Sequence, residues 1–488
     1  MKTRHSVLRF FLFPAALLSI AAISPARANT VWYVKPGGGT APQTGLSWAH
    51  AFPTVEQAIA AASPTRDALG KTDEVWCAEG LYTPPVTVPP PPALPYSNGF
   101  IINKSLKLYG GFKGTENNNH ARLGSFKRTY LDGNINNPSL YTDNAFHVVN
   151  ITGVLGYQLD PGVLIDGFVI RNGYATGAGV NGAGILSNVS DLDLANCYFR
   201  SNYAAPGTNY GGGLYFTSLV GGGVEPTVAN LLRIKNSEFE GNHGWEGGAI
   251  YGNSVRGEIV NTKIFGSEST LNGAGVYLAR MGPSNWLDFT SCVFYDNSCT
   301  GQDVFGGGLY LGPAAGLGSG GKAKLVNCTF AANECGVNSI THLLQAGQAM
   351  GVSSGSQALV YNSILYWNNT TGPGGPAPVS GPATVDWSDV EGGWIPMANN
   401  LNSDPKFVNL PGGDLSLQLT PTASDCIDAA DYSQLPLDNL DVDGDGITTG
   451  EIIPWDIAWQ GRWFDQLAVL DHGVGLFSFL DMGAYERH

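Results

Sequence analysis

The sequence is poor in charged residues, and those it has are mostly negative. Asp, Glu, Lys and Arg make up 13% of its 488 residues, against about 25% in a typical soluble chain. The 25 basic residues are outnumbered by 40 acidic ones, which gives a formal net charge of −15. A surface of this sign repels phosphate groups, so we predict no nucleic-acid partner.

Beyond its first residues the sequence also lacks an apolar run long enough to cross a membrane. Residues 10–23 are apolar, but this run is short and contains Pro14, which is typical of a signal peptide rather than a membrane span. Basic residues precede the run, and small residues at 26 and 28 suit signal peptidase. We therefore predict that residues 1–28 are a signal peptide. The mature chain is then secreted to the exterior, the cell surface or the periplasm, with no membrane span.

Glycine, in contrast, is abundant. There are 66 glycines, nearly twice the usual share of about 7%. No Gly-X-Y period accompanies them, which excludes collagen. A hydrophobic share of 43% also argues against disorder, because so much apolar surface can be buried.

A phrase with a hydrophobic anchor and flanking asparagines recurs from about residue 180. Its anchors are spaced 40, 25, 30, 36 and 35 residues apart, at Phe199, Phe239, Ile264, Phe294, Phe330 and Leu365. A period that varies while its core phrase persists excludes coiled coils and helical solenoids, and it indicates short strands joined by loops of variable length. Apolar and polar residues alternate within each phrase. Asparagine at the bend tolerates a left-handed backbone and can bond to the asparagine of the next coil. The predicted fold is an all-β, right-handed parallel β-helix, a solenoid.

An open solenoid must cover its ends, because unpaired strand edges aggregate. Residues 31–34 form a predicted edge strand. Residues 54–62 have a capping-box start and an apolar face, which predicts a short capping helix. We divide the mature chain into an N-terminal cap (29–73), the β-helix (74–395) and an acidic C-terminal segment (396–488).

Several short motifs stand out along the mature chain. They are Ser-Trp-Ala-His-Ala-Phe at 47–52, Leu-Tyr-Gly-Gly-Phe-Lys-Gly-Thr-Glu at 108–116, Leu-Asp-Gly at 131–133, Ser-Asp-Val-Glu-Gly-Gly at 388–393, Asp-Pro-Lys-Phe-Val at 404–408 and Asp-Met-Gly-Ala-Tyr-Glu at 481–486. With these motifs the mature chain resembles bacterial β-helix proteins of the choice-of-anchor Q type, and its repeats resemble those of chlamydial polymorphic outer-membrane proteins. The resemblance covers nearly all of residues 30–487 and implies the β-helix fold but no activity.

An acidic loop in the C-terminal segment resembles the start of a calcium-binding loop. Asp441, Asp443 and Asp445 stand at positions 1, 3 and 5, with glycine at position 6, as calcium loops require. The carbonyl of Ile447 would be the ligand at position 7, and Glu451 stands one residue before position 12. The loop lacks flanking amphipathic helices. We predict a structural calcium ion, and the alternative is a solvated, metal-free acidic turn.

Seven cysteines suit an exported protein, and the odd count leaves at least one thiol unpaired within the chain. The absence of a Cys-x-x-Cys motif argues against zinc. Cys299 follows Cys292 by seven residues, and Cys335 follows Cys328 by the same distance, one coil further along. We therefore predict a disulfide between Cys299 and Cys335. Small core residues are expected at Cys197, Cys292 and Cys328.

Catalysis on a polysaccharide would need carboxylates beside a base, or two facing carboxylates. The columns directly beside the anchors hold no such cluster, so only analogy of fold supports an enzyme. Exposed aromatic residues favour a strip that stacks on sugar rings. The alternative is that they cover the core. The candidates are Tyr198, Tyr295, Tyr366, Trp367, Tyr210 and Trp245.

The leading interpretation is a secreted, monomeric, non-catalytic β-helix that binds a glycan, such as a polysaccharide, or a cell-surface partner. One alternative is a polysaccharide lyase or glycoside hydrolase with its site in the loops at 203–229, 311–322 or 369–383. The other is a structural component of an envelope or matrix. Clustered carboxylates with a base on one face would favour the enzyme, and an aromatic strip without them would favour binding.

Overall fold

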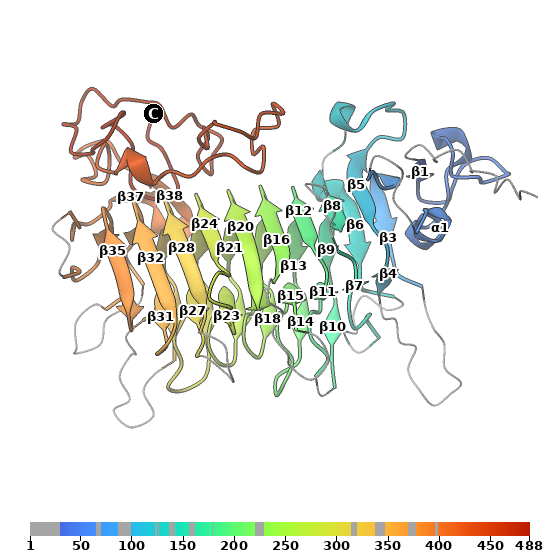
Figure 1. Cartoon of the computed structure of the whole chain (residues 1–488), viewed down its shortest axis with the longest axis horizontal. Coiled ribbons are helices and arrows are strands. Elements are labelled where there is room, and N and C mark those ends of the chain that lie inside the picture. The colour runs from blue at the N-terminus through green and yellow to red at the C-terminus, as the bar shows by residue number, and fades with distance from the viewer. Residues whose placement is uncertain are drawn as a thin grey trace, which may run out of the picture.

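The computed structural model describes residues 30–64, 70–85, 99–122, 124, 126–135, 141, 143–155, 162–177, 179–219, 229–313, 320–336, 347–368, 377–395 and 399–488. The predicted signal peptide (1–28) lies outside these residues, as do parts of the three loops named above. Three long parallel sheets and a fourth, shorter one in the middle coils form an elongated solenoid (Figure 1). The predicted parallel β-helix is therefore confirmed.

Sheet 1 has eleven strands. They are β1 (Val31–Val34), β2 (Glu74–Ala78), β5 (Leu106–Phe112), β8 (Val163–Asp166), β12 (Leu192–Ala195), β16 (Asn230–Lys235), β20 (Val255–Val260), β24 (Leu287–Thr290), β28 (Lys322–Val326), β32 (Gln357–Tyr361) and β35 (Ala383–Asp386).

Sheet 2 has ten strands. They are β3 (Gly80–Tyr82), β6 (Thr129–Asp132), β9 (Val169–Arg171), β13 (Tyr198–Arg200), β17 (Glu238–Glu240), β21 (Lys263–Phe265), β25 (Val293–Tyr295), β29 (Thr329–Ala331), β33 (Ile364–Leu365) and β36 (Asp389–Val390).

Sheet 3 has nine strands and sheet 4 has six. Those of sheet 3 are β4 (Phe100–Ile102), β7 (Val149–Thr152), β11 (Ile185–Asn188), β15 (Leu214–Thr217), β19 (Ile250–Asn253), β23 (Val276–Ala279), β27 (Leu309–Leu311), β31 (Met350–Val352) and β34 (Val379–Ser380). Those of sheet 4 are β10 (Tyr174–Ala175), β14 (Tyr203–Ala204), β18 (His243–Gly244), β22 (Glu268–Ser269), β26 (Ser298–Cys299) and β30 (Glu334–Cys335).

A complete coil passes through sheets 1, 2, 4 and 3 in that order, as β12, β13, β14 and β15 show. The predicted anchors fill the core between the sheets. The rings of Phe199 and Phe239 stack with centroids 4.3 Å apart, and those of Phe294 and Phe330 stack at 4.2 Å. All four side chains are fully buried. Stacking of equivalent residues on successive coils thus builds one continuous hydrophobic core.

The asparagines have two different roles in the coil. Those at the bend between sheets 1 and 2 adopt a positive φ, for example 50° at Asn196 and 51° at Asn236, as predicted. A second set, three residues after the anchor, is fully buried and forms most of the side-chain ladder. Asn297 donates to Asn333 at 2.9 Å, and Asn333 donates to Asn368 at 2.8 Å.

The predicted N-terminal helix is confirmed as α1 (Val55–Ala61), the one α-helix of the described residues. The hydroxyl of Thr54 caps it by accepting a hydrogen bond from the Gln57 amide at 3.4 Å. Val55, Ala58 and Ile59 are buried against the first coils. None of the described helices is long and apolar enough to span a membrane.

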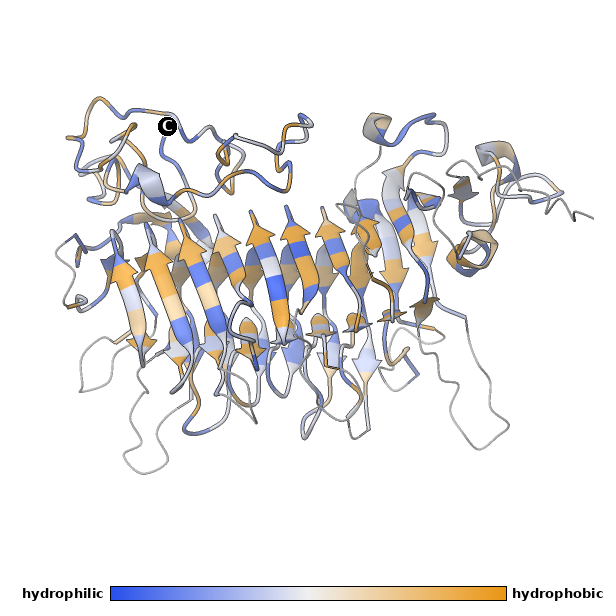
Figure 2. Cartoon of the chain, viewed as in Figure 1, coloured by the Kyte–Doolittle hydropathy of each residue, from blue (hydrophilic) through white to orange (hydrophobic). Residues whose placement is uncertain are grey.

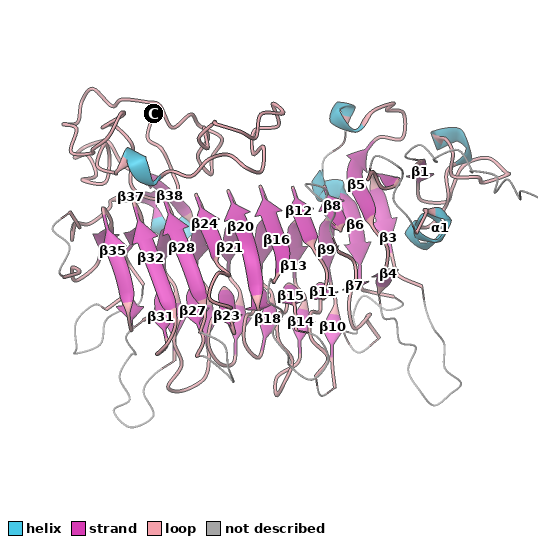
Figure 3. Ribbon diagram, in the orientation of Figure 1, coloured by secondary structure: helices cyan, strands magenta, loops and turns pink. Residues whose placement is uncertain are grey.

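The C-terminal segment (residues 399–488) is mostly irregular and lies along the β-helix (Figure 3). It contains a small antiparallel hairpin of β37 (Phe407–Asn409) and β38 (Asp414–Leu417). Single 3-10 turns occur in it and elsewhere, namely η1 (Trp48–His50), η2 (Asn119–Ala121), η3 (Phe126–Arg128), η4 (Leu410–Gly412) and η5 (Tyr432–Gln434).

The bend residues of several coils bind this segment. Asn362 donates to the Asp431 carbonyl and Asn327 to the Asp481 carbonyl, each at 2.8 Å. Arg462 donates to the hydroxyl of Ser291 at 2.6 Å, and Asn236 donates to the Val442 carbonyl at 3.0 Å. The segment therefore follows the corner between sheets 1 and 2, where it covers part of the outer surface.

Candidate functional site

A groove of about 930 Å³ lies between the outer face of sheet 1 and the acidic loop of the C-terminal segment. Strands β5, β8, β12 and β16 supply its floor, and residues 439–444 supply its opposite wall. Because strands of a parallel sheet pair in register, the outward side chains of the floor stack in columns.

One of these columns is charged along five consecutive strands. We call it the charged column, and its register is continuous across the strand pairs of sheet 1. Hydrophilic bands cross the strands of this sheet in Figure 2. The members, in order along the solenoid, are Asp193, Arg233, Glu258, Asp288 and Lys324.

This column was not among the predicted sites, although the sequence contains a signal for it. Each member lies six residues before a core anchor, for example Asp193 before Phe199 and Asp288 before Phe294. The columns directly beside the anchors, on which the prediction rested, belong to sheet 2. The anchor spacing itself locates the column on sheet 1.

Within the charged column, Arg233 binds Asp193 through two hydrogen bonds of 2.7 and 2.5 Å. Glu258 and Asp288 are direct neighbours on β20 and β24. Burial, and then the negative charge of Asp288, raise the pKa of Glu258 to about 7, although Arg233 acts against this rise. Burial also raises the pKa of Asp288, which Lys324 partly offsets. Glu258 can therefore hold a proton near neutral pH, beside a second carboxyl group whose pKa is also raised.

Basic side chains gather at the end of the groove nearest the N-terminal cap, where Lys71, Lys107 and Arg122 line it. Arg122 forms an ion pair of 2.8 Å with Asp166 and lies over the ring of Tyr109, 5.6 Å from its centroid. Altogether five basic and four acidic side chains line the groove. This is a high local share of positive charge for a chain with a net charge of −15.

The acidic loop is fixed to the floor of the groove. The ammonium group of Lys235 donates to the carbonyls of Leu440 and Asp441 at 2.7 and 2.6 Å. Val442 is buried together with Val260 of the neighbouring strand β20 and Ile453 of the C-terminal segment. These contacts place the predicted calcium loop at the edge of the groove.

The structure brings the predicted ligands of this loop together. Oxygens of Asp441, Asp443 and Asp445 lie within 4.8 Å of one another. Ile447 is exposed and donates its amide to Asp445 at 2.7 Å. Partial burial, and then the charges of the nearby aspartates, raise the pKa of Glu451. One of its carboxylate oxygens is buried without a hydrogen-bond partner among the described residues. The group has the oxygen chemistry that calcium prefers, and calcium itself stays a prediction.

The six aromatic candidates do not form one strip. Tyr198 lies on β13 beneath the ammonium of Lys127, 4.9 Å from its ring centroid. Tyr295 lies in another column of sheet 2, and its hydroxyl donates to the Leu410 carbonyl of the C-terminal segment at 2.8 Å. Trp367 is 47% exposed and packs edge-on against Tyr366 at 5.8 Å. Side chains of other types stand between these aromatics, so no continuous stacking surface results.

Tyr210 and Trp245 lie elsewhere on the molecule. Tyr210 stacks at 4.8 Å on Tyr251, which belongs to a tyrosine ladder on sheet 3 formed by Tyr215, Tyr251, Tyr277 and Tyr310. The inner rings of this ladder cover one another's faces, so these faces cannot stack on sugars. Trp245 is half-buried in the turn that follows β18.

The predicted disulfide residues are direct partners in the structure. Cys299 on β26 pairs with Cys335 on β30, and both are buried. The structure has both as thiols, so the disulfide stays a prediction. Cys197, Cys292 and Cys328 are fully buried in the core, which confirms their predicted packing role.

No family model matches the sequence, and no curated protein matches it either. Among solved structures, pectate lyase Pel9A is 14% identical with a TM-score of 0.42, over 95% of this chain and 98% of that one. A pectin methylesterase from carrot is 11% identical with a TM-score of 0.32, over 74% of this chain and 91% of that one. Escherichia coli ybhc is 13% identical with a TM-score of 0.32, over 69% of this chain and 82% of that one. These values carry no argument about function, which must come from the groove itself.

Proposed function

We propose that this protein is a secreted β-helix that binds an acidic polysaccharide in the groove between sheet 1 and the acidic loop. The main support is that five basic side chains line this groove, although the chain as a whole is strongly acidic. Carboxylated sugars can bind such side chains through charge-assisted hydrogen bonds. Secretion rests on the signal peptide predicted from the sequence.

Calcium in the acidic loop would strengthen this binding. The lining carries five positive and four negative side chains, so a bound divalent cation would raise its net charge from about one to about three. The ion would also offset the mutual repulsion of Asp441, Asp443 and Asp445. Binding should therefore depend on calcium even if no sugar touches the ion.

Co-sedimentation and calorimetry of residues 29–488 would test the proposal, with polygalacturonate, alginate and a neutral glucan, in calcium and in chelator. We expect binding to the two acidic polymers in calcium and little binding to the glucan. Lys107→Gln should weaken it by about threefold to tenfold. Lys127→Gln removes the same charge from η3, where Lys127 pairs with Glu238 of sheet 2 outside the groove, and should leave binding unchanged. Equal affinity for the neutral glucan would contradict the proposal.

A glycoside hydrolase is the second candidate, because Glu258 and Asp288 are neighbouring carboxylates with raised pKa values beside the groove. Hydrolysis uses such a pair, one carboxyl as acid and the other as base or nucleophile. The test is whether the wild-type chain releases new reducing ends from a polysaccharide. Release by the wild type that is absent in both Glu258→Gln and Asp288→Asn would favour a hydrolase over simple binding.

A further inference from the structure

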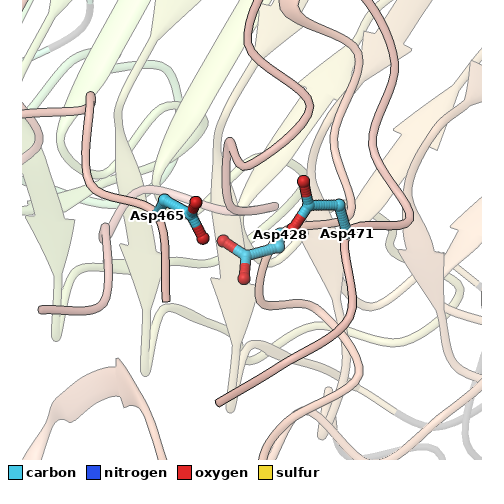
Figure 4. A group of neighbouring side chains, drawn as sticks. All are labelled: Asp428, Asp465 and Asp471. Atoms are coloured by element: carbon cyan, nitrogen blue, oxygen red, sulfur yellow. The ribbon is translucent and has the colours of Figure 1, made fainter. Parts of the chain in front are cut away.

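A second group of acidic side chains lies in the C-terminal segment, separate from the acidic loop. It consists of Asp428, Asp465 and Asp471, which come from three different stretches of irregular chain (Figure 4). One carboxylate oxygen from each lies within 4.8 Å of the others. In Figure 4 the carboxylates of Asp428 and Asp465 point toward one another, and Asp471 lies beside Asp428.

Asp428 is the unusual member of this group. Its side chain is fully buried, with 0% exposure, yet neither carboxylate oxygen has a hydrogen-bond partner among the described residues. Burying a carboxylate without a partner is unfavourable, because the loss of its hydration is not compensated. Asp465 and Asp471 are exposed, so the group is open to solvent on one side.

The backbone groups of Asp428 are hydrogen-bonded, so only its side chain lacks partners among the described residues. Its amide donates to the Asp481 carboxylate at 2.8 Å. Its carbonyl accepts hydrogen bonds from the amides of His472 and Gly473 at 2.7 and 2.8 Å. The backbone of Asp428 is thus held firmly while its carboxylate points toward that of Asp465 (Figure 4).

The charges around Asp428 indicate which kind of partner its carboxylate lacks. Burial, and then the negative charges of Asp471 and Asp465, raise the pKa of Asp428 to about 7. The amide of Gln466 offsets part of this rise without reaching hydrogen-bonding geometry. Each neighbouring charge that acts on this carboxylate is negative, so a cation would satisfy all three side chains at once.

We propose that Asp428, Asp465 and Asp471 bind a calcium ion, independently of the groove and of the acidic loop. Opposite ligands of calcium lie about 4.6–5.2 Å apart, given metal–oxygen distances of 2.3–2.6 Å. Three oxygens within 4.8 Å of one another fit into one such sphere. Water can fill the remaining positions on the exposed side. The ion joins the stretch 465–471 to Asp428 and, through the Asp428 amide, to Asp481 in the closing motif.

Calcium titration of chelator-treated 29–488 by calorimetry tests this site. Asp428→Asn and Asp465→Asn should each remove one calcium equivalent, or weaken one site at least tenfold. Asp443→Asn should affect only the acidic loop. Asp414→Asn, an exposed aspartate on β38, is the matched control. Because Asp465 is exposed, its variant should fold even if Asp428→Asn does not.

Thermal unfolding gives a second readout. The calcium-dependent rise in Tm should be smaller in Asp465→Asn than in the wild type and unchanged in Asp414→Asn. In chelator, Asp428→Asn should be at least as stable as the wild type, because the uncompensated charge is gone. The same stoichiometry and affinity in wild type and Asp465→Asn would overturn the proposal, as would a wild-type chain that binds no calcium.

Discussion

The ammonium nitrogen of Lys235 lies 2.6 Å from the carbonyl oxygen of Asp441, 206 residues further along the chain. This hydrogen bond, with a second one to Leu440, attaches the acidic loop to β16. Lys235 of sheet 1 therefore helps to fix the groove wall and the predicted calcium ligands, together with Asn236 and the packing of Val442.

Lys235→Met should release the loop and weaken both calcium binding there and polysaccharide binding in the groove, each by about threefold to tenfold. The fold itself should lose about 3 kcal/mol, because two hydrogen bonds from a charged group are removed, each worth about 1.5 kcal/mol at the low end. Calorimetry and urea unfolding measure these effects. Lys324→Met is the control, since it removes a charge from the same sheet without contacting the loop. Unchanged calcium affinity in Lys235→Met would show that the loop holds its own shape.

Glu258 should make stability depend on pH. Its pKa is about 7 in the folded chain and about 4.3 when unfolded, so the folded state holds the extra proton between these values. Stability should therefore fall as pH rises from about 4.5 to 7. Glu258→Gln should raise the free energy of unfolding by about 1–2 kcal/mol at pH 8, after allowance for solvent screening, and change it little at pH 4.5. Urea unfolding at both pH values measures this, with Glu240→Gln on sheet 2 as the control.

Arg462 is a fully buried arginine beside two buried carboxyl groups. Its guanidinium lies 3.8 Å from Glu486, and its charge also acts on Asp481. Arg462→Ala should destabilise the chain by about 3–5 kcal/mol, because it leaves buried acids without compensation. The double variant Arg462→Met with Glu486→Gln should recover part of this loss. Chemical denaturation measures both, and an equal loss in the two variants would indicate lost packing instead of unpaired charge.

Oxidised protein should contain the Cys299–Cys335 disulfide, because the two residues are register partners on adjacent parallel strands, and Cα atoms of such partners are about 4.8 Å apart. Peptide mapping without reduction would detect the linked peptides. Cys292 and Cys328 are also on neighbouring coils but are expected to remain reduced. Linked peptides from that pair alone would contradict the assignment.

The sequence was sufficient for the fold because its signals are local and repeated. Alternation around Phe199 and its equivalents predicted the strands, Asn196 and its equivalents predicted the positive-φ bends, and Thr54 predicted the start of α1. These features depend on a few adjacent residues, so variable loops do not obscure them.

The site was harder to predict because its residues meet only in three dimensions. Glu258 and Asp288 are neighbours across two strands, and finding them required the anchor spacing to be applied to sheet 1. Asp428 and Asp465 are brought together by irregular chain that has no periodicity at all. The aromatic strip was expected from exposure, but the C-terminal segment covers Tyr295 and the coils separate the others.

The path of the C-terminal segment has a consequence for how the molecule unfolds. In a simple solenoid each coil contacts only its neighbours, so unfolding can begin at one end and proceed coil by coil. Here one segment is hydrogen-bonded to the bends at Asn236, Ser291, Asn327 and Asn362. Coils that do not touch each other are thus coupled, and this part of the molecule should open as a single cooperative unit rather than fray from its last coil.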